Sequence, residues 1–267
     1  MAVLCYSASA GFDFDNLSSD ITEAAAAGFG GLELNFEAVM RHLSRGGSFL
    51  ELRTRVDATG LELVAAGEIY LYPEYGTQLY QEEEQLNALN DRLALMYEFF
   101  HQLHCRRCVV MPPRVASAED WALFTEYRIT SDCVRILRLF IDQMSYIDWL
   151  LCPVRGDFSM VKSASRGLEI AACVGSPKAG TLVDLALIED NGPEQLKACA
   201  DNIWVKLVRL SGDEQRDLHF LRALVELGCK APLASPEIEP APGEAQGAFI
   251  RRLFAYTKNT AQKAGYL

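Results

Sequence analysis

The sequence predicts an α/β fold, a single (β/α)8 barrel in which eight parallel strands alternate with helices. At 267 residues the chain has the length of one such barrel, and half of its residues are hydrophobic, enough for a large core. Eight short apolar segments recur along it, and nearly every interval between them has room for a helix. We find no internal linker, low-complexity tract or long repeat, so one domain is expected over residues 1–267.

The expected strands are short apolar runs, and the expected helices are the longer stretches between them. The strand candidates are Ala2–Tyr6, Gly31–Asn35, Glu62–Ala66, Cys108–Met111, Trp149–Val154, Ala179–Asp184, Ile203–Leu210 and Leu233–Glu237. The helix candidates are Leu17–Ala27, Ser48–Thr59, Gln78–Leu103, Ser131–Tyr146, Ser163–Val174, Gly192–Ala200, Gln215–Leu227 and Gly247–Ala264. The stretch from Pro236 to Gly247 is rich in proline and glycine and is expected to be the last βα loop.

Composition argues against two classes of partner. The net charge of −11 and the pI near 4.9 disfavour nucleic acid, because phosphate binding needs a basic face. No apolar run approaches the roughly 20 residues that span a bilayer, so no membrane partner is expected. The apolar start, Met1–Tyr6, lacks basic residues and soon meets Asp13 and Asp15, which argues against a signal peptide and for a cytoplasmic protein.

The eight cysteines are scattered through expected strands and helices, as buried free thiols are in a reducing compartment. Cys105 and Cys108 have the spacing of a zinc or redox pair. A structural zinc site would need a second pair, and a redox motif would open a helix, whereas these residues lead into an apolar strand. Packing is therefore the favoured interpretation of this pair.

Two parts of the chain resemble the xylose-isomerase-like family of sugar phosphate isomerases and epimerases. In Ala24–Leu34 an alanine-rich helix ends at Gly28-Phe29 and leads into a strand carrying Glu33, and the segment from Phe49 to Val64 continues the likeness. Gly28 would supply the left-handed helix cap, and Glu33 would face away from the leucines on either side of it.

The second half carries the rest of the resemblance in four strand ends. Each resembles a strand end of the family's ketose 3-epimerases or its metal site, and the four occur in the family's order: Leu151–Val154, Gly175–Asp184, Ile203–Asp213 and Ala231–Glu237. The resemblance therefore covers nearly the whole chain and implies the same barrel.

The resemblance also implies a metal site, which this sequence departs from. Family members hold one divalent cation through Glu, Asp, His and Glu on successive strand ends, and the two glutamates move protons beside a carbonyl. In this sequence the first glutamate is Cys152, the aspartate remains as Asp184 with Leu187 in place of its histidine partner, the histidine is Arg209, and the last glutamate remains as Glu237. The neighbouring Glu239 competes with Glu237 in this alignment.

Arginine stays protonated and cannot ligate a cation. We therefore expect Arg209 to fill the position of the metal and to pair with Asp184 and Glu237. No cofactor is expected, and a divalent metal (Mn, Mg or Zn) is disfavoured. If one binds, Asp184 and Glu237 are its expected ligands. The four histidines fall in helices or at helix ends, away from the strand termini.

Barrel active sites lie at the carboxyl ends of the strands, so side chains there are the candidate site. The expected catalytic residues are Glu237, Asp184 and Arg209, and the expected substrate contacts are Glu33, Glu68, Tyr70, Arg114, Cys152 and Arg155. Arg114, Arg155 and Arg209 could together hold a carboxylate or phosphate, which points to an anionic substrate. Each residue has a plainer alternative: Tyr70 could pack within its loop, Arg114 and Arg155 could be ordinary loop charges, and Cys152 is better explained as a small buried side chain than as a nucleophile.

Three functional hypotheses follow. The first is an isomerase or epimerase for a small anionic sugar-like or keto-acid substrate, in which Glu237 with Asp184 or Glu33 shuttles a proton and Arg209 stabilises the enolate. A dehydratase or lyase would use the same enolate. The second class is a barrel that has lost catalysis and binds a ligand or partner, and the third is the family's endonuclease branch, which we discount because the chain lacks its histidines and a basic surface. A homo-oligomer is left open.

Overall fold

The structure is a computed structural model, and it describes residues 2–8, 17–69, 83–112, 125–156, 159–189, 196 and 204–267. Its eight strands form one closed barrel in sequence order, each parallel to its neighbours, with β1 pairing with β8 to close it. The strands are β1 Leu4–Ser7, β2 Gly31–Asn35, β3 Glu62–Ile69, β4 Arg107–Val110, β5 Asp148–Leu151, β6 Ala179–Asp184, β7 Val205–Arg209 and β8 Leu233–Ala234.

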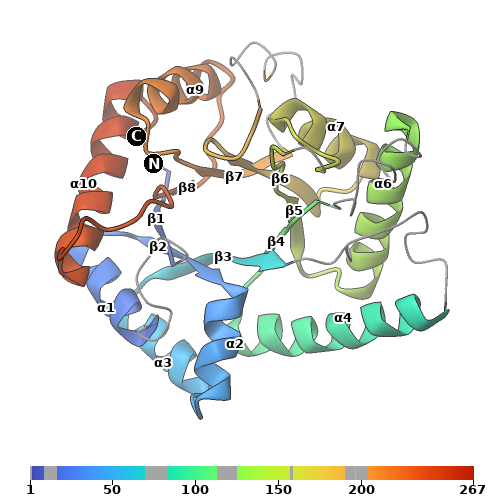
Figure 1. Cartoon of the computed structure of the whole chain (residues 1–267), viewed down its shortest axis with the longest axis horizontal. Helices are drawn as coiled ribbons and strands as arrows, with labels where there is room; N and C mark the ends of the chain where they lie inside the picture. The colour runs from blue at the N-terminus through green and yellow to red at the C-terminus, as the bar shows by residue number, and fades with distance from the viewer. Residues whose placement is uncertain are drawn as a thin grey trace.

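Helices surround the barrel on the outside (Figure 1). They are α1 Leu17–Ala27, α2 Phe36–Ser44, α3 Phe49–Thr59, α4 Glu83–Leu103, α6 Glu126–Gln143, α7 Ala164–Val174, α9 Glu214–Glu226 and α10 Gln246–Ala264. In the part of the chain that the structure describes, no helix is long and apolar enough to cross a membrane. The (β/α)8 prediction is confirmed.

Most predicted elements agree with the structure to within a few residues, and α1, β2 and β6 have the predicted bounds. Ser48 and Ser163 were predicted inside helices; they are N-caps, whose hydroxyls accept from the backbone N–H of Glu51 and Arg166. The predicted helix Gly192–Ala200 lies outside the described residues except for Leu196.

Helix α2 is an element that the sequence reading passed over. It begins directly after β2, where the Asn35 side chain accepts a hydrogen bond from the N–H of Ala38 at 3.1 Å. No element was predicted over residues 36–44, but an Asn N-cap followed by an amphipathic segment is a helix start. Strand β8 is also shorter than predicted: only Leu233 and Ala234 pair, and the chain to Gln246 has no regular structure.

Two kinds of core hold the barrel together. Leu32 and Leu34 of β2 pack in the layer between sheet and helices, and Glu33 between them faces the other way, the alternation that was predicted. The barrel interior is filled by side chains from the strands themselves, among them Leu150, Leu182 and Leu207. Because side chains alternate along a strand, the residue two positions after Leu207, Arg209, also faces the interior, at the carboxyl end of the barrel.

Asp20 links the first helix to the last. It is buried in α1 and accepts a hydrogen bond from the side-chain amide of Gln246 at the start of α10, while Ser19 donates to the same amide at 2.9 Å. Burial raises the pKa of Asp20 to about 7, and the bond to Gln246 offsets part of that shift.

Asp20→Asn is expected to flatten the pH dependence of stability. A carboxyl whose pKa is raised on folding contributes stability that is complete below pH 4 and is lost as the pH rises through about 7. The amide keeps the bond to Gln246 without titrating, so the stability of the variant relative to the wild type should be greater at pH 8 than at pH 4 by about 3–4 kcal/mol. Urea unfolding at the two pH values measures this, and an equal difference at both would contradict it.

Candidate functional site

The candidate site is built around the guanidinium of Arg209, the last residue of β7. Arg209 lies beside Asp184 in the register of β6 and β7, so the two side chains leave neighbouring strand ends together. Its Nη1 is 2.8 Å from Asp184 Oδ2, 2.8 Å from Glu68 Oε1 and 2.8 Å from Glu237 Oε1. The expected pairing of Arg209 with Asp184 and Glu237 is present in the structure.

The edge of the guanidinium that carries Nε and Nη2 contacts Glu33 on β2, across the barrel. Arg209 donates to the two Glu33 oxygens through Nη2 at 2.6 Å and Nε at 3.3 Å. Such a two-pronged pair is the strongest geometry available between arginine and a carboxylate. Four carboxylates from four different strand ends therefore converge on one cation, and with all of them ionised the cluster has a formal charge of −3.

Local structure fixes each carboxylate in place. Asp184 uses its second oxygen, Oδ1, to accept from the backbone N–H of Ala186 at 2.8 Å and of Leu187 at 3.2 Å, which ties it to the turn after β6. Glu68 follows Gly67, where a Cβ would lie 2.4 Å from the Cβ of Val109 and 2.7 Å from its carbonyl oxygen. Only glycine permits this close approach of β3 to β4, which sets the position of Glu68.

Ser7 at the end of β1 is a site residue that the sequence reading missed. Its hydroxyl donates to Glu237 Oε1 at 3.0 Å, and its backbone N–H donates to the Ser235 hydroxyl at 3.1 Å. The signal available in the sequence was the position of Ser7 directly after the first predicted strand, because the carboxyl end of that strand also faces the active site of a barrel.

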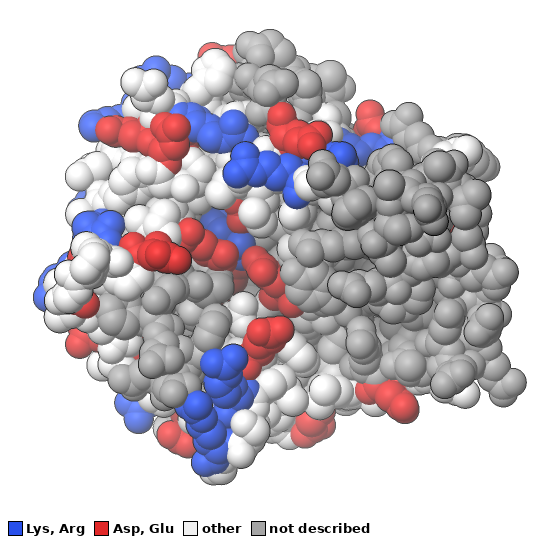
Figure 2. Space-filling view, viewed as in Figure 1, with Lys and Arg blue, Asp and Glu red and all other residues white. Residues whose placement is uncertain are grey.

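Exposure divides the four carboxylates into two pairs. The side chains of Glu33 and Asp184 are 3% and 2% exposed and Arg209 is 1% exposed, whereas Glu68 and Glu237 are 20% and 26% exposed. The buried pair therefore anchors the guanidinium, and the partly exposed pair, Glu68 and Glu237, lies where a small molecule could reach it. Viewed down the barrel, acidic side chains gather toward the middle of the face (Figure 2).

Burial and mutual repulsion set the ionisation of the cluster. Burial raises the pKa of Asp184 to about 6 and raises that of Glu33, in each case against the lowering effect of Arg209. For Arg209, burial alone would lower the pKa, but the four surrounding carboxylates hold it well above its usual value. Arg209 is therefore a permanent cation, and a proton at neutral pH is held most readily on the carboxylates.

The remaining predicted contacts are distributed differently. Cys152 is fully buried in the barrel interior, and burial raises the pKa of its thiol well above the usual range, which fits a packing side chain rather than a nucleophile. Arg155 is exposed, beside the turn after β6, and Arg209 contacts carboxylates instead of joining it in an anion clamp. Tyr70 and Arg114 lie outside the described residues. Cys105 and Cys108 are buried free thiols, as predicted.

The fit of a divalent cation depends on the position that Arg209 takes. Carboxylates alone can hold such an ion, but here three of them direct an oxygen at the same nitrogen, Nη1, which already carries the positive charge they surround. Among the described residues no group of three His, Cys, Asp or Glu side chains is arranged to hold a metal. The residues present therefore do not fit a divalent cation while Arg209 keeps this place.

The barrel matches many solved structures. The IolI protein, solved with a bound zinc atom, matches with a TM-score of 0.78 at 16% identity over 99% of both chains. A xylose isomerase domain protein from Salmonella typhimurium LT2 gives 0.72 at 16% identity, over 97% of this chain and 98% of that one. The chain has the xylose isomerase-like TIM-barrel fold. Neither a protein family model nor a curated protein sequence matches it.

Other xylose isomerase-like barrels show the range of chemistry on this fold. D-Psicose 3-epimerase from Clostridium cellulolyticum H10 gives a TM-score of 0.70 at 12% identity, covering 99% of this chain and 98% of that one. An AP endonuclease of family 2 from Brucella melitensis gives 0.69 at 16% identity, covering 93% and 97%. At such identities the likeness establishes the fold, and the activity of this xylose isomerase-like barrel has to be argued from its own site.

Proposed function

We propose that this protein is an isomerase or epimerase that moves a proton at a carbon next to a carbonyl and that needs no divalent cation. The observation that carries the proposal is the position of Arg209 Nη1, 2.8 Å from Glu68, Asp184 and Glu237 at the carboxyl end of the barrel. A fixed cation with proton-accepting groups on either side is the minimum that enolisation requires.

In the proposed reaction Glu237 or Glu68 takes the proton from the carbon, and the electron pair of that bond moves onto the carbonyl oxygen to form an enolate. The fixed positive charge of Arg209 offsets part of the developing negative charge. Its N–H groups are held by the carboxylates, so the factor of about 10²–10³ in rate that one free preorganised donor supplies is an upper bound for this contribution. If the opposite carboxyl starts protonated while the first starts ionised, donation of its proton to the other face inverts the carbon and leaves the two protonation states exchanged. Return of the abstracted proton to the neighbouring carbon, with transfer of the hydroxyl proton to the former carbonyl oxygen, gives the isomer. Ser7 positions Glu237 through its hydroxyl.

The exposure of the carboxylates revises the roles expected from the sequence. Asp184 and Glu33 were candidates for the second proton carrier, but both are buried behind the guanidinium and bonded to it. Glu68, expected only to bind substrate, is partly exposed, as Glu237 is, and is the better partner. Asp184 and Glu33 then serve to hold Arg209.

The negative charge of the cluster limits which group of the substrate can bind against it. A phosphate or carboxylate placed directly against a group with a formal charge of −3 would be repelled, so the reacting end of the substrate is proposed to be a neutral hydroxy-carbonyl group. An anionic group, if the substrate has one, would bind on the rim, where Arg155 is exposed. Arg114, outside the described residues, is a further candidate from the sequence alone.

Hydrogen–deuterium exchange tests the proposal before the natural substrate is known. The protein is stripped of metal with a chelator and incubated in D₂O with ketoses, sugar phosphates and hydroxy keto acids. Proton NMR then follows the hydrogen beside the carbonyl. Enzyme-dependent loss of that signal, unaffected by chelator, supports the proposal. Exchange that appears only when metal is restored would overturn its metal-independent part. A product that has lost a hydroxyl would instead identify the related dehydratase or lyase.

One observation favours a second candidate, a barrel that binds a ligand or partner without catalysis. Arg209 is 1% exposed and its donors are engaged by carboxylates. The cluster could therefore stabilise the end of the barrel without contacting a substrate. This alternative expects no exchange with any hydroxy-carbonyl compound and no change in partner binding when Glu237 is replaced.

A further inference from the structure

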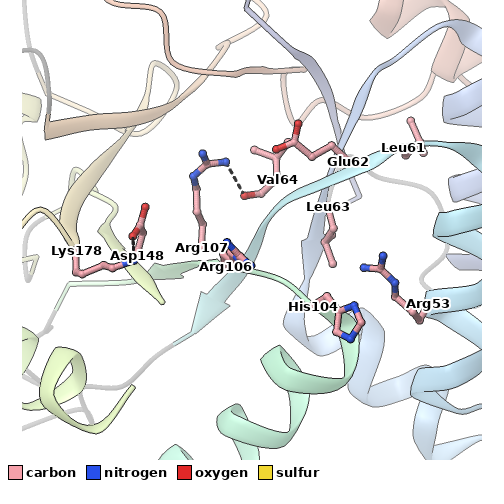
Figure 3. Close-up of a pocket in the computed structure, with 10 residues that line it drawn as sticks. All are labelled: Arg53, Leu61, Glu62, Leu63, Val64, His104, Arg106, Arg107, Asp148 and Lys178. Carbon is pink, nitrogen blue, oxygen red and sulfur yellow. Dashed lines mark hydrogen bonds and ion pairs between the residues drawn. The ribbon is translucent and has the colours of Figure 1, made fainter. Parts of the chain in front are cut away.

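A polar cavity of about 450 Å³ opens at the end of the barrel opposite to Arg209. Figure 3 shows the residues that line it. It is lined by the residues with which strands begin: Glu62 begins β3, Arg107 begins β4 and Asp148 begins β5. Because the strands are parallel, their first residues share one face and their last residues share the other. The cavity is therefore separate from the candidate active site.

The lining is basic in an acidic protein. Arg53, Arg106, Arg107 and Lys178 face it together with two carboxylates, which leaves a formal charge of +2 in a chain whose net charge is −11. Asp148 is already paired with Lys178 at 3.1 Å, and Lys206 approaches it at 3.9 Å. The Arg53 guanidinium is paired with Asp57 in the same way. The positive charge available to a ligand therefore comes from the remaining basic side chains, Arg106 and Arg107.

Two adjacent arginines provide that charge. Arg107 extends into the middle of the space that the labelled residues surround, with Nη1 donating to the carbonyl of Val64 at 3.2 Å (Figure 3). Arg106 is exposed, and within the described ranges the structure records no ion pair for its side chain. A guanidinium bound only to a carbonyl keeps most of its five donors for a ligand, and its planar fork suits the oxygens of phosphate or carboxylate.

The backbone at His104 is a second, independent observation. Helix α4 ends at His104 with φ of 55°, the only positive φ outside glycine among the described residues. Helices α1, α3, α7 and α10 end at glycines with φ between 72° and 106°. Glycine takes this conformation at least cost, and here it is taken by a residue that lines the cavity beside Arg53 (Figure 3).

We propose that this cavity binds a small polyanion, phosphorylated or polycarboxylate, through Arg106 and Arg107. Its volume lies within the range of about 300–1,000 Å³ that small-ligand sites occupy. The face concerned usually serves stability in such barrels, so a ligand there acts apart from catalysis. The inference is independent of the proposed function, because it concerns a different face and is tested by binding.

Isothermal titration at low ionic strength with pyrophosphate and with citrate tests the site. The wild type is expected to bind one equivalent of at least one probe, and Arg106→Gln and Arg107→Gln are each expected to weaken it at least tenfold. Tighter binding of pyrophosphate would identify a phosphorylated ligand, and tighter binding of citrate a polycarboxylate. Because the Arg106 side chain is exposed, its variant tests the site even if Arg107→Gln folds poorly.

Two controls make the result decisive. Arg55→Gln changes an exposed arginine on the same helix as Arg53 that does not line the cavity, and it should leave the affinity unchanged. Glu237→Gln, at the other end of the barrel, should also leave it unchanged. The proposal is overturned if the wild type binds neither probe, if Arg55→Gln weakens binding as much as Arg106→Gln, or if Glu237→Gln abolishes binding.

Discussion

Glu237→Gln is expected to lower the rate of enzyme-dependent hydrogen exchange by about 10²–10⁴-fold, the usual contribution of one general base. The amide keeps the size of the side chain and can still accept from Ser7 and Arg209, but it cannot take a proton from carbon. The measurement is the initial rate of exchange in D₂O, with the best substrate of the panel, for both proteins.

Glu239→Gln is the matched control, because it makes the same chemical change two residues away on an exposed side chain. It should keep the wild-type rate within about twofold, since exposed substitutions away from special features have effects of about 0.5 kcal/mol or less. Equal loss in both variants would transfer the catalytic assignment to Glu239 or to the loop. An unaffected Glu237→Gln protein would remove Glu237 from the mechanism.

The same substitution should not destabilise the protein. The cluster has four carboxylates for one cation, so neutralising one of them relieves repulsion while the other three still surround Arg209. We expect the free energy of unfolding of Glu237→Gln to equal or exceed that of the wild type. Loss of exchange without loss of stability would separate a chemical role from a structural one.

Arg209→Met is expected to destabilise the fold by about 3–5 kcal/mol at pH 7.5, the cost of removing one partner from a buried ion pair. Methionine fills much of the volume but leaves the Glu33 and Asp184 carboxylates buried without a cation. Part of the loss should be recovered at pH 5, because buried carboxyls with raised pKa values gain protons on folding as the pH falls. Urea unfolding at both pH values measures the effect.

Arg138→Met provides the comparison for that result. Its guanidinium donates to the carbonyls of Cys173 at 3.0 Å and Val174 at 3.2 Å at the end of α7, with no carboxylate involved. Its loss should cost about 1–2 kcal/mol and should not depend on pH between 5 and 7.5. If Arg209→Met were no more damaging than Arg138→Met, the four carboxylates would not depend on the guanidinium.

The barrel could be predicted from the sequence because the residues that end its helices and mark its strands are recognised locally. Gly28 ends α1 with a positive φ, and apolar runs such as Ala179–Asp184 could be recognised without knowing what they pack against. Helix α2 was not predicted because it follows β2 with no intervening turn, so the Asn35 cap was the only signal that marked its start. The pairing of Arg209 with Asp184 could be predicted because neighbouring parallel strands bring their ends together.

The composition of the site could be predicted less well. Whether Glu33 faces a substrate or Arg209 depends on how far a guanidinium on β7 reaches across the barrel, a distance that no spacing in the sequence encodes. The exposed fraction that separates Glu68 from Glu33 is likewise a property of the assembled strand ends. The basic cavity draws on five separate segments, and its arginines look in the sequence like ordinary surface charges.

The most direct test of the account is a titration of the chelator-treated wild-type protein with Mn²⁺ and Zn²⁺, followed by calorimetry and by the melting temperature. Arg209 is proposed to take the place of a metal, so the account predicts no stoichiometric binding and no rise in melting temperature with either ion. One equivalent of bound metal that raises the melting temperature would mean that Arg209 leaves its carboxylates. That result would contradict the central claim.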